Sequence, residues 1–280
     1  MLASLLLVAG SVQADPPAAA PDAAASAIAA IRSDYDVMLK PGQAIVVDNP
    51  YGNVSARFGG FEHKVETHAV LQEPAGAVHI ELKPGQDSAG RYSLAPRLPA
   101  GTTLAQGQRL DLALFVPEGH ALSVDTKQGQ IQVYGVHSNV QLRSEEGDIK
   151  IRGIKGAIVA ETGEGSIEAA LGTAPRKASQ RLATRTGEIR IGVDDHLDAA
   201  LDMATSGLFA TEYSLKVARK PGEEPNKRAQ SVIGEAHSRL LIESKRGQIS
   251  VFRRAKFTAT GGQSSAAQDQ EEEQEDNDSD

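Results

Sequence analysis

The sequence predicts an all-β fold and, within that class, a β-solenoid: a single domain of stacked, short-strand repeats. Three segments between residues 124 and 171, VDTKQGQIQVYGV, LRSEEGDIKIRGI and AETGEGSIEAAL, are copies of one pattern. Their glycines, Gly129, Gly147 and Gly165, are spaced 18 residues apart. Apolar and polar residues alternate on both sides of each glycine, so each copy is predicted to form two strands joined at a glycine corner. We call such a pair of strands a rung.

The copies fill equivalent slots with equivalent residue types. The residues two and four positions after the glycine and five positions before it are apolar, and the residue three positions before it is a small hydroxyl. The apolar slots hold Val124, Ile131, Val133, Leu142, Ile149, Ile151, Ala160, Ile167 and Ala169, and the hydroxyl slots hold Thr126, Ser144 and Thr162. We expect the apolar side chains to line the interior and the hydroxyls to stack as a ladder at the corner. Glycine is expected to supply the sharp turn there.

Further copies extend the pattern. Complete ones occupy 182–193 and 242–252, around Gly187 and Gly247, and an early half-copy surrounds Gly52. Repeats of about this length, made of short strands and corners, are typical of solenoids in which each rung is closed by its neighbours. The alternative is an antiparallel β-sandwich in which the glycines form ordinary hairpin turns. The constant phase of the copies and the scarcity of two-residue hairpin signals favour the solenoid.

One copy is worn. Around Gly207, Asp202 and Thr211 occupy slots that should be apolar. The glycine steps after residue 165 are 22, 20 and 40 residues. Because the last step is two repeats long, the sequence predicts that an insertion hides one rung between residues 207 and 247.

The N-terminal part of the chain divides into two segments. Residues 1–14 are predicted to be a signal peptide, because an apolar run precedes a small-x-small site at Val12–Ala14; a buried strand or helix is the alternative. The run is too short to span a bilayer, and no second run follows it. Residues 15–36 are predicted to be an Ala/Pro-rich linker, in which a short helix at Ala23–Ile31 is compatible with the composition.

The β-repeat domain is predicted to span residues 37–257. Strands are expected at Ala44–Val47 and, from period-2 alternation, in four segments before the regular copies. These four segments are 64–72, 77–85, 110–119 and 120–126. Residues 87–108 are rich in Gly, Pro and Ser and are expected to form an irregular excursion, and 213–239 a charged loop that interrupts the rungs.

The order of these segments carries a family resemblance. The opening VDNPYGNVSARFG, the central LALFVPEGHALSVDTKQGQIQVYGV and the serial xGxIxV copies resemble the bacterial putative-adhesin β-strand-repeat proteins. That family is a domain of unknown function, similar to autotransporter-adhesin head domains, and the resemblance covers roughly 37–254. It implies a β-solenoid at the cell envelope or cell surface, usually without catalysis. It implies no residue-level active site.

Charge is distributed unevenly along the chain. Lys216 to Lys256 contains 11 Lys and Arg against 4 Asp and Glu, whereas Gln268–Asp280 contains 8 acids and no base. The whole net charge of −8 therefore lies in this last segment, and residues 258–280 are predicted to be a disordered acidic tail. Either the tail only solubilises the chain, or it competes for a basic face that otherwise meets anionic envelope polymers.

Few residues suggest chemistry. There is no cysteine, and the seven histidines lack metal-ligand spacing, so we predict no catalytic, cofactor-binding or metal residue and no cofactor. The acidic concentration outside the tail is VDDHLDAALD, which contains Asp194, Asp195, His196, Asp198 and Asp202. Paired carboxylates on a solenoid face can cleave glycosides or bind calcium, and Asp is also favoured in turns.

These observations predict a non-catalytic envelope or cell-surface protein, an adhesin-like binding or assembly module, exported to the periplasm, cell surface or medium. Expected partners are cell-envelope or surface glycans or proteins. The alternative is a polysaccharide-active β-solenoid enzyme that uses the Asp194–Asp202 cluster. With no Trp and 4% aromatic residues, the chain lacks sugar platforms and base-stacking side chains, so a nucleic-acid partner is not expected. End-to-end polymerisation is a third interpretation, which the linker and tail would oppose at the two ends.

Overall fold

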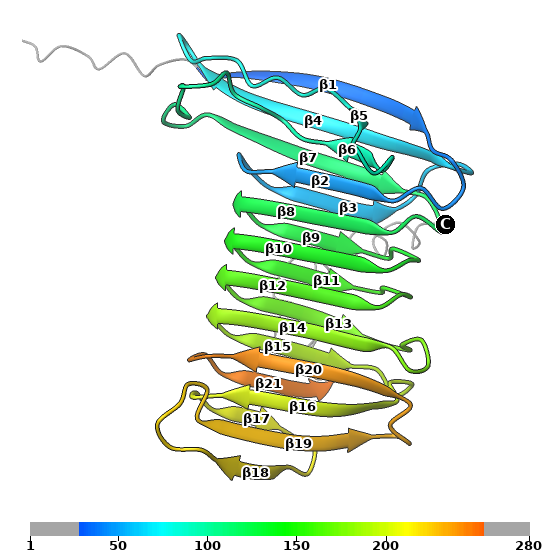
Figure 1. Ribbon diagram of the computed structural model, residues 1–280, viewed down its shortest axis with the longest axis vertical. Helices are drawn as coiled ribbons and strands as arrows, with labels where there is room; N and C mark the ends of the chain where they lie inside the picture. The colour runs from blue at the N-terminus through cyan, green and yellow to red at the C-terminus, as the bar shows by residue number, and fades with distance from the viewer. Residues whose placement is uncertain (1–27, 255–280) are drawn as a thin grey trace, which may run out of the picture.

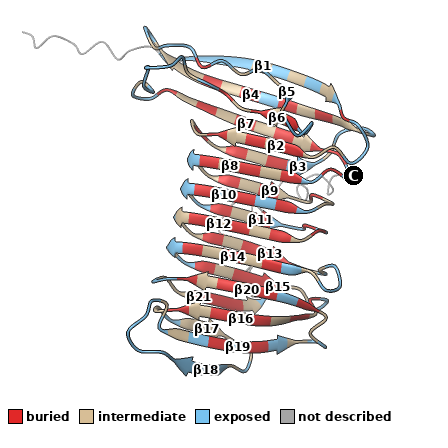
Figure 2. Cartoon of the chain, viewed as in Figure 1, coloured by how far each residue is buried: buried red, intermediate tan, exposed pale blue. Residues whose placement is uncertain are grey.

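Two facing β-sheets run the length of the molecule, and each repeat contributes one strand to each sheet (Figure 1). The computed structural model describes residues 28–254. The first sheet has ten strands in the order β1-β4-β7-β3-β9-β11-β13-β15-β21-β17, and the second has eleven in the order β18-β19-β16-β20-β14-β12-β10-β8-β2-β6-β5. Buried side chains recur along the rungs of both sheets (Figure 2). The all-β, β-solenoid prediction is confirmed.

Seven rungs form the stack. Each pairs one strand of the second sheet with one strand of the first. In spatial order they are β2 (Ile45–Asn49) with β3 (Val54–Phe58), β8 (Leu122–Gln128) with β9 (Ile131–Tyr134), β10 (Val140–Glu146) with β11 (Ile149–Arg152), β12 (Ile158–Glu164) with β13 (Ile167–Leu171), β14 (Ser179–Thr186) with β15 (Ile189–Val193), β20 (Ser238–Ser244) with β21 (Ile249–Arg253), and β16 (Ala199–Thr205) with β17 (Phe209–Thr211). Neighbouring rungs pair in parallel in both sheets, so the antiparallel sandwich is the wrong alternative for the repeats.

The interior is lined by the predicted apolar slots. Ile131, Ile149, Ile167, Ile189 and Ile249 are all buried and lie opposite one another in the parallel register of the first sheet. The rung formed by β12 and β13 has a slim interior because Ala160 and Ala169 occupy its slots. Burial of one aliphatic side chain per slot is the main source of stability in such a stack.

The rungs do not stack in chain order. β21 pairs with β15 on one side and with β17 on the other, and β20 likewise lies between β14 and β16. Figure 1 shows this last repeat, in orange, between two earlier ones. The prediction of a hidden rung between residues 207 and 247 is therefore wrong. After β14 and β15 the chain forms the terminal rung, β16 with β17, and the later strands β20 and β21 then lie between these two rungs.

The copy around Gly207 keeps Thr211 in an apolar slot, opposite Val251, as predicted, but its first strand is shifted by one residue. The register places Met203 opposite Ile242 and Thr205 opposite Ser244. The hydroxyl thus stands two residues before the glycine, instead of three. Asp202 consequently faces outward, and the buried Met203 takes the apolar slot that the fixed spacing had assigned to Asp202.

Glycine and hydroxyl columns run along the corners. Gly165 has a φ of 151°, and a Cβ there would approach the carbonyl oxygen of Gly147 closer than 3.0 Å. Four hydroxyls donate to the glycine carbonyl of the neighbouring rung: Thr162 to Gly147 at 2.9 Å, Thr184 to Gly165 at 2.9 Å, Ser244 to Gly187 at 2.9 Å and Thr205 to Gly247 at 2.6 Å. The predicted hydroxyl ladder is present, and it satisfies carbonyls at the corners, where the strand ladder is interrupted.

Antiparallel strands close the N-terminal end. β1 (Ile28–Met38) pairs with β4 (Lys64–Pro74), which pairs with β7 (Arg109–Val116), and β7 joins β3 in parallel. The linker and short helix predicted for this stretch are wrong over 28–36, which is strand. Residues 1–27 lie outside the described residues, so the signal peptide and the rest of the linker stay predictions.

The excursion after β4 contributes short strands to the second sheet. β6 (Tyr92–Leu94) pairs in parallel with β2, and β5 (Gly85–Gln86) pairs antiparallel with β6. The strand expected at 77–85 is reduced to the start of β5 and one bridge between Glu81 and Arg97. Pro84 and the Gly, Pro and Ser residues of the excursion limit regular pairing there.

A hairpin covers the C-terminal end of the second sheet. β18 (Lys216–Arg219) and β19 (Lys227–Ile233) form within the predicted loop, and β19 pairs antiparallel with β16. The predicted loop over 213–239 is thus partly wrong, because its polar residues form an edge hairpin. The predicted tail, 258–280, and the domain end at 257 lie outside the described residues. Within 28–254 no helix has the length and apolar character needed to cross a membrane.

Candidate functional site

The structure distributes the Asp194–Asp202 acids among different bases. Asp194 Oδ2 lies 3.4 Å from Arg254, and Asp202 Oδ2 lies 2.6 Å from Arg239. Asp198 pairs with His237, while Asp195 and His196 are exposed. The acids that the sequence grouped together therefore do not form one carboxylate centre.

The pKa values of the three paired acids are all lowered. For Asp194 the main cause is the backbone N–H of His196, and for Asp198 it is the His237 side chain. For Asp202, burial raises the pKa, but hydrogen bonds from Gln230 and Arg239 outweigh it. A glycosidase needs one carboxyl whose pKa is raised so that it can donate a proton to the leaving group. None of these three acids meets that requirement.

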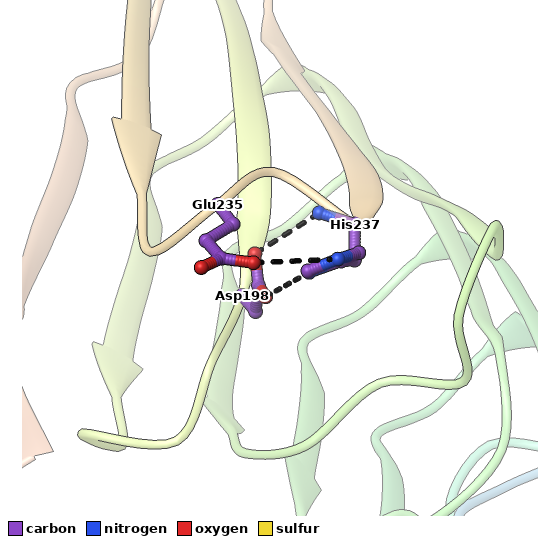
Figure 3. A group of neighbouring side chains, drawn as sticks. All are labelled: Asp198, Glu235 and His237. Atoms are coloured by element: carbon purple, nitrogen blue, oxygen red, sulfur yellow. Dashed lines mark hydrogen bonds and ion pairs between the residues drawn. The ribbon is translucent and has the colours of Figure 1, made fainter.

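Asp198, Glu235 and His237 form the one group in residues 28–254 whose ligand atoms could converge on a metal ion, all lying within 4.8 Å of one another (Figure 3). Glu235 and His237 belong to the turn from β19 to β20. His237 donates its backbone N–H to Asp198 Oδ1 at 3.0 Å and pairs through Nδ1 with Asp198 Oδ2. Both carboxylate oxygens of Asp198 are therefore already occupied, and the Glu235 side chain is 83% exposed.

The trio thus fixes a turn. The hydroxyl and backbone N–H of Ser238 also bond the carbonyl of Asp198, at 2.6 and 3.2 Å. Asp198 was singled out from the sequence, but its partners stand about 40 residues away in no recognisable spacing. The sequence does give one indication of this role: Asp198 directly precedes the strand that contains Asp202, at a point where the chain turns.

A groove of about 520 Å³ crosses the outer face of the second sheet near its C-terminal end. Two adjacent rows of outward-facing residues form its floor, and the strand register defines both. One row is Arg181, Leu241, Asp202, Gln230 and Lys216, and the other is Glu243, Ala204, Arg228 and Ala218. The β18–β19 hairpin thus extends a surface that the rungs begin.

The groove has an excess of positive charge. Arg239 is neutralised by Asp202, and Arg181 lies 3.0 Å from Glu161 and 4.0 Å from Glu243. Lys216 and Arg228 are exposed and make no ion pair within residues 28–254. The basic excess found in the sequence between 216 and 256 is therefore partly neutralised, and Lys216 and Arg228 remain available to an anion in the groove.

The fold and the groove can be compared with known proteins. The family model described as Toastrack DUF4097 matches residues 52–252, which is more than half of the chain. The chain belongs to this family. The matched range begins at the glycine of the first rung and ends within β21, so it leaves out β2 but covers β3 and both strands of the six other rungs. The resemblance to a β-repeat domain of unknown function is confirmed.

The solved structures that align with this Toastrack chain have low identity to it. A putative cell adhesion protein from Clostridium sporogenes is 12% identical, with a TM-score of 0.47, covering 80% of this chain and 100% of its own. A putative adhesin from Bacteroides fragilis is 14% identical, with a TM-score of 0.40, covering 81% of this chain and 98% of its own. Among curated proteins none matches the chain.

Proposed function

We propose that this protein is a non-catalytic, adhesin-like binding module of the cell envelope or cell surface, and that the groove beside the β18–β19 hairpin binds anionic polysaccharides. The observation that carries the proposal is the pair of unpaired cations, Lys216 and Arg228, on adjacent rows of an extended concave face. A linear polysaccharide with regularly spaced negative charges is suited to a sheet face on which the rows of side chains are regularly spaced. The apolar signal expected at residues 1–14 supports export.

The enzyme alternative has weaker support. The acids it requires are held by three different bases, and each has a lowered pKa. A turn anchor and a groove-neutralising ion pair account for Asp198 and Asp202 without chemistry. Binding without turnover is the function that the geometry supports best.

The direct test is binding of the full chain to polygalacturonate, a polyuronate, with neutral dextran as the uncharged comparison. K216A/R228A should weaken binding roughly threefold to tenfold at low salt, because two exposed charges are lost from the contact surface. The matched control is K127A/K155A, which removes two exposed lysines outside the groove. An equal loss in the control, or equal binding to dextran, would contradict the proposal.

The acidic tail allows a second test of the same proposal. Deletion of residues 268–280 removes 8 acids and should strengthen binding to polygalacturonate if the tail competes for the groove. The gain should shrink as salt rises towards 0.5 M, since screening shortens the range of the competing charges to about 4 Å. Unchanged affinity would mean that the tail only solubilises the chain. Phosphatidylglycerol vesicles, run in parallel, distinguish an anionic lipid surface from an anionic glycan.

A further inference from the structure

The N-terminal end of the first sheet presents a long, uninterrupted strand edge. All eleven residues of β1 pair with β4, and within residues 28–254 β4 is the only strand beside β1. Along its other edge, alternate backbone N–H and C=O groups of residues 28–38 therefore have no strand partner in the part of the chain that the structure describes. Figure 1 shows β1 as the outermost strand at that end.

This edge lacks most of the features that usually prevent pairing: it is long, unbulged and free of Pro and Lys, and its three charged residues, Arg32, Asp34 and Asp36, include both signs. Natural edge strands are short, bulged, or interrupted by Pro or Lys. β1 has no Pro, Gly or Lys and pairs without a bulge, and Ile28, Ile31 and Met38 are 54%, 39% and 64% exposed. The other edges of the two sheets differ: β5 has two residues, β17 has three, and β18 has four, of which Lys216 and Arg219 are charged. Only the β1 edge has the length and regularity of a docking strand.

The β1 sequence is complementary to itself. In an antiparallel pair of copies centred on Ser33, Arg32 lies opposite the Asp34 of the second copy, and this contact occurs twice by symmetry. The same register places Ala30 opposite Asp36, and at the remaining positions it places apolar or aromatic residues opposite one another. These matched positions are Ile28 with Met38, Ala29 with Val37, and Ile31 with Tyr35.

Neighbouring registers are unfavourable. A register centred on Arg32 places Arg32 against itself, and one centred on Asp34 places Asp34 against itself. Like charges directly opposite one another destabilise a strand pair. Intermediate registers would bring opposite sheet faces together, because side chains alternate with period 2. The register centred on Asp34 also places Arg32 opposite Asp36, but of the three registers only the one centred on Ser33 pairs Arg32 with an acid and places no like charges opposite one another.

The charged groups for this contact are accessible. Arg32 is exposed and makes no ion pair within residues 28–254. Asp34 bonds His68 at 2.7 Å, but its side chain is 71% exposed, so its carboxylate can accept a second donor. We propose that two copies of this chain associate through β1, edge to edge and antiparallel, to form a closed twofold dimer in which the first sheets of both copies become continuous.

Closure follows from the symmetry. A strand that pairs with its own copy about a twofold axis occupies the same edge in both molecules, so the contact does not propagate. The edges at the C-terminal end, β17 and β18, are too short to offer a second site of this kind in the described part of the chain. The inference therefore differs from the end-to-end polymer considered from the sequence.

Sedimentation of the full chain across a concentration series tests the dimer, together with charge exchange. Arg32→Asp and Asp34→Arg should each weaken dimerisation by about tenfold, because two attractive contacts become repulsive. R32D/D34R should restore it, because the exchanged charges again lie opposite one another. The double variant also lacks the His68 contact of Asp34, so restoration cannot come from a repaired monomer.

A crosslink fixes the register independently. The chain has no cysteine, so Ser33→Cys should form a disulfide-linked dimer under mild oxidation, since residue 33 lies opposite its own copy. Ser123→Cys, half-buried in the middle of the stack, is the matched control and should stay uncrosslinked. A monomer at all concentrations, a dimer insensitive to the charge variants, or equal crosslinking of both cysteines would overturn the proposal.

Discussion

At the scale of single residues, the corner of each rung is defined by a contact between two backbones. The glycine carbonyl of one rung occupies the space that a Cβ of the next would need, and this holds for Gly129, Gly147, Gly165, Gly187, Gly207 and Gly247. Three of these glycines also have a φ between 151° and 155°. Rungs can therefore approach to strand-pairing distance at the corner only without a side chain.

The corner predicts a graded alanine series. Gly165→Ala should lower the free energy of unfolding by about 2–4 kcal/mol, because backbone strain and a clash with Gly147 are combined. Gly90→Ala, with a φ of 77° and open space around it, should cost only about 1 kcal/mol. Gly85→Ala has neither problem and serves as the control. Urea unfolding midpoints in any other order would contradict the stacking of the corners.

The turn at Asp198 predicts a pH dependence. The pKa of Asp198 lies below the ordinary 3.8, chiefly because of the His237 side chain and secondarily because of the His237 backbone N–H. A lowered folded-state pKa contributes stability that is present above the unfolded pKa and is lost as pH falls through the folded value. Wild-type protein should therefore be more stable than D198N at pH 6, and the difference should shrink below about pH 4. If the difference in unfolding midpoint between wild-type protein and D198N did not change with pH, the destabilisation by D198N would come from packing alone.

At the scale of elements, the order of the rungs in the stack differs from their order in the sequence at the last repeat. The register places Ala183 opposite Glu243, and Glu243 opposite Ala204. Adjacent strands lie about 4.8 Å apart, within the Cα range of a disulfide, whereas strands two positions apart lie about 9.6 Å apart, beyond it. In a cysteine-free chain, A183C/E243C should therefore form a disulfide on oxidation and A183C/A204C should not. A disulfide in A183C/A204C and none in A183C/E243C would instead show that the rungs stack in sequence order.

The same elements show what a sequence pattern can predict. Interior slots such as Ile149 and Ile167 follow from a period-2 pattern in fixed phase with a glycine, because local backbone geometry alone determines which face they take. The position of β20 and β21 does not follow, since every repeat offers the same edges and only the whole assembly selects its neighbours. At Gly207 a one-residue shortening moved Met203 into the slot assigned to Asp202.

The candidate site was predictable only in outline. The basic excess of residues 216–256 is a property of composition. Which cations stay available depends on contacts such as Arg239 with Asp202, 37 residues apart in the chain. The self-complementary edge of β1 was also missed, because an Ala-rich composition near Ile28 indicated a linker, whereas pairing with β4 decided its structure. Tertiary pairing outweighed local propensity there.

At the scale of the whole molecule, a stack with unlike ends should open unevenly. Each inner rung pairs with a neighbour on both sides, whereas β18 pairs on one side only and all four of its residues are exposed. Nearest-neighbour coupling of this kind lets a solenoid unfold locally from an end. Amides of β18 should exchange with solvent much faster than those of β12, which is paired on both sides.

A central substitution extends this prediction. Leu182 is fully buried in β14, and Leu182→Ala should cost about 2–5 kcal/mol through the lost side chain and the cavity it leaves. Exchange should rise most in β14 and in its partners β12 and β20, and least in β1 and β4 at the far end. Ala183→Ser, outward-facing on the same strand, is the control and should leave protection unchanged. A uniform rise across all strands would instead show that the stack unfolds as one cooperative unit, so that the rungs transmit strain over the full length of both sheets.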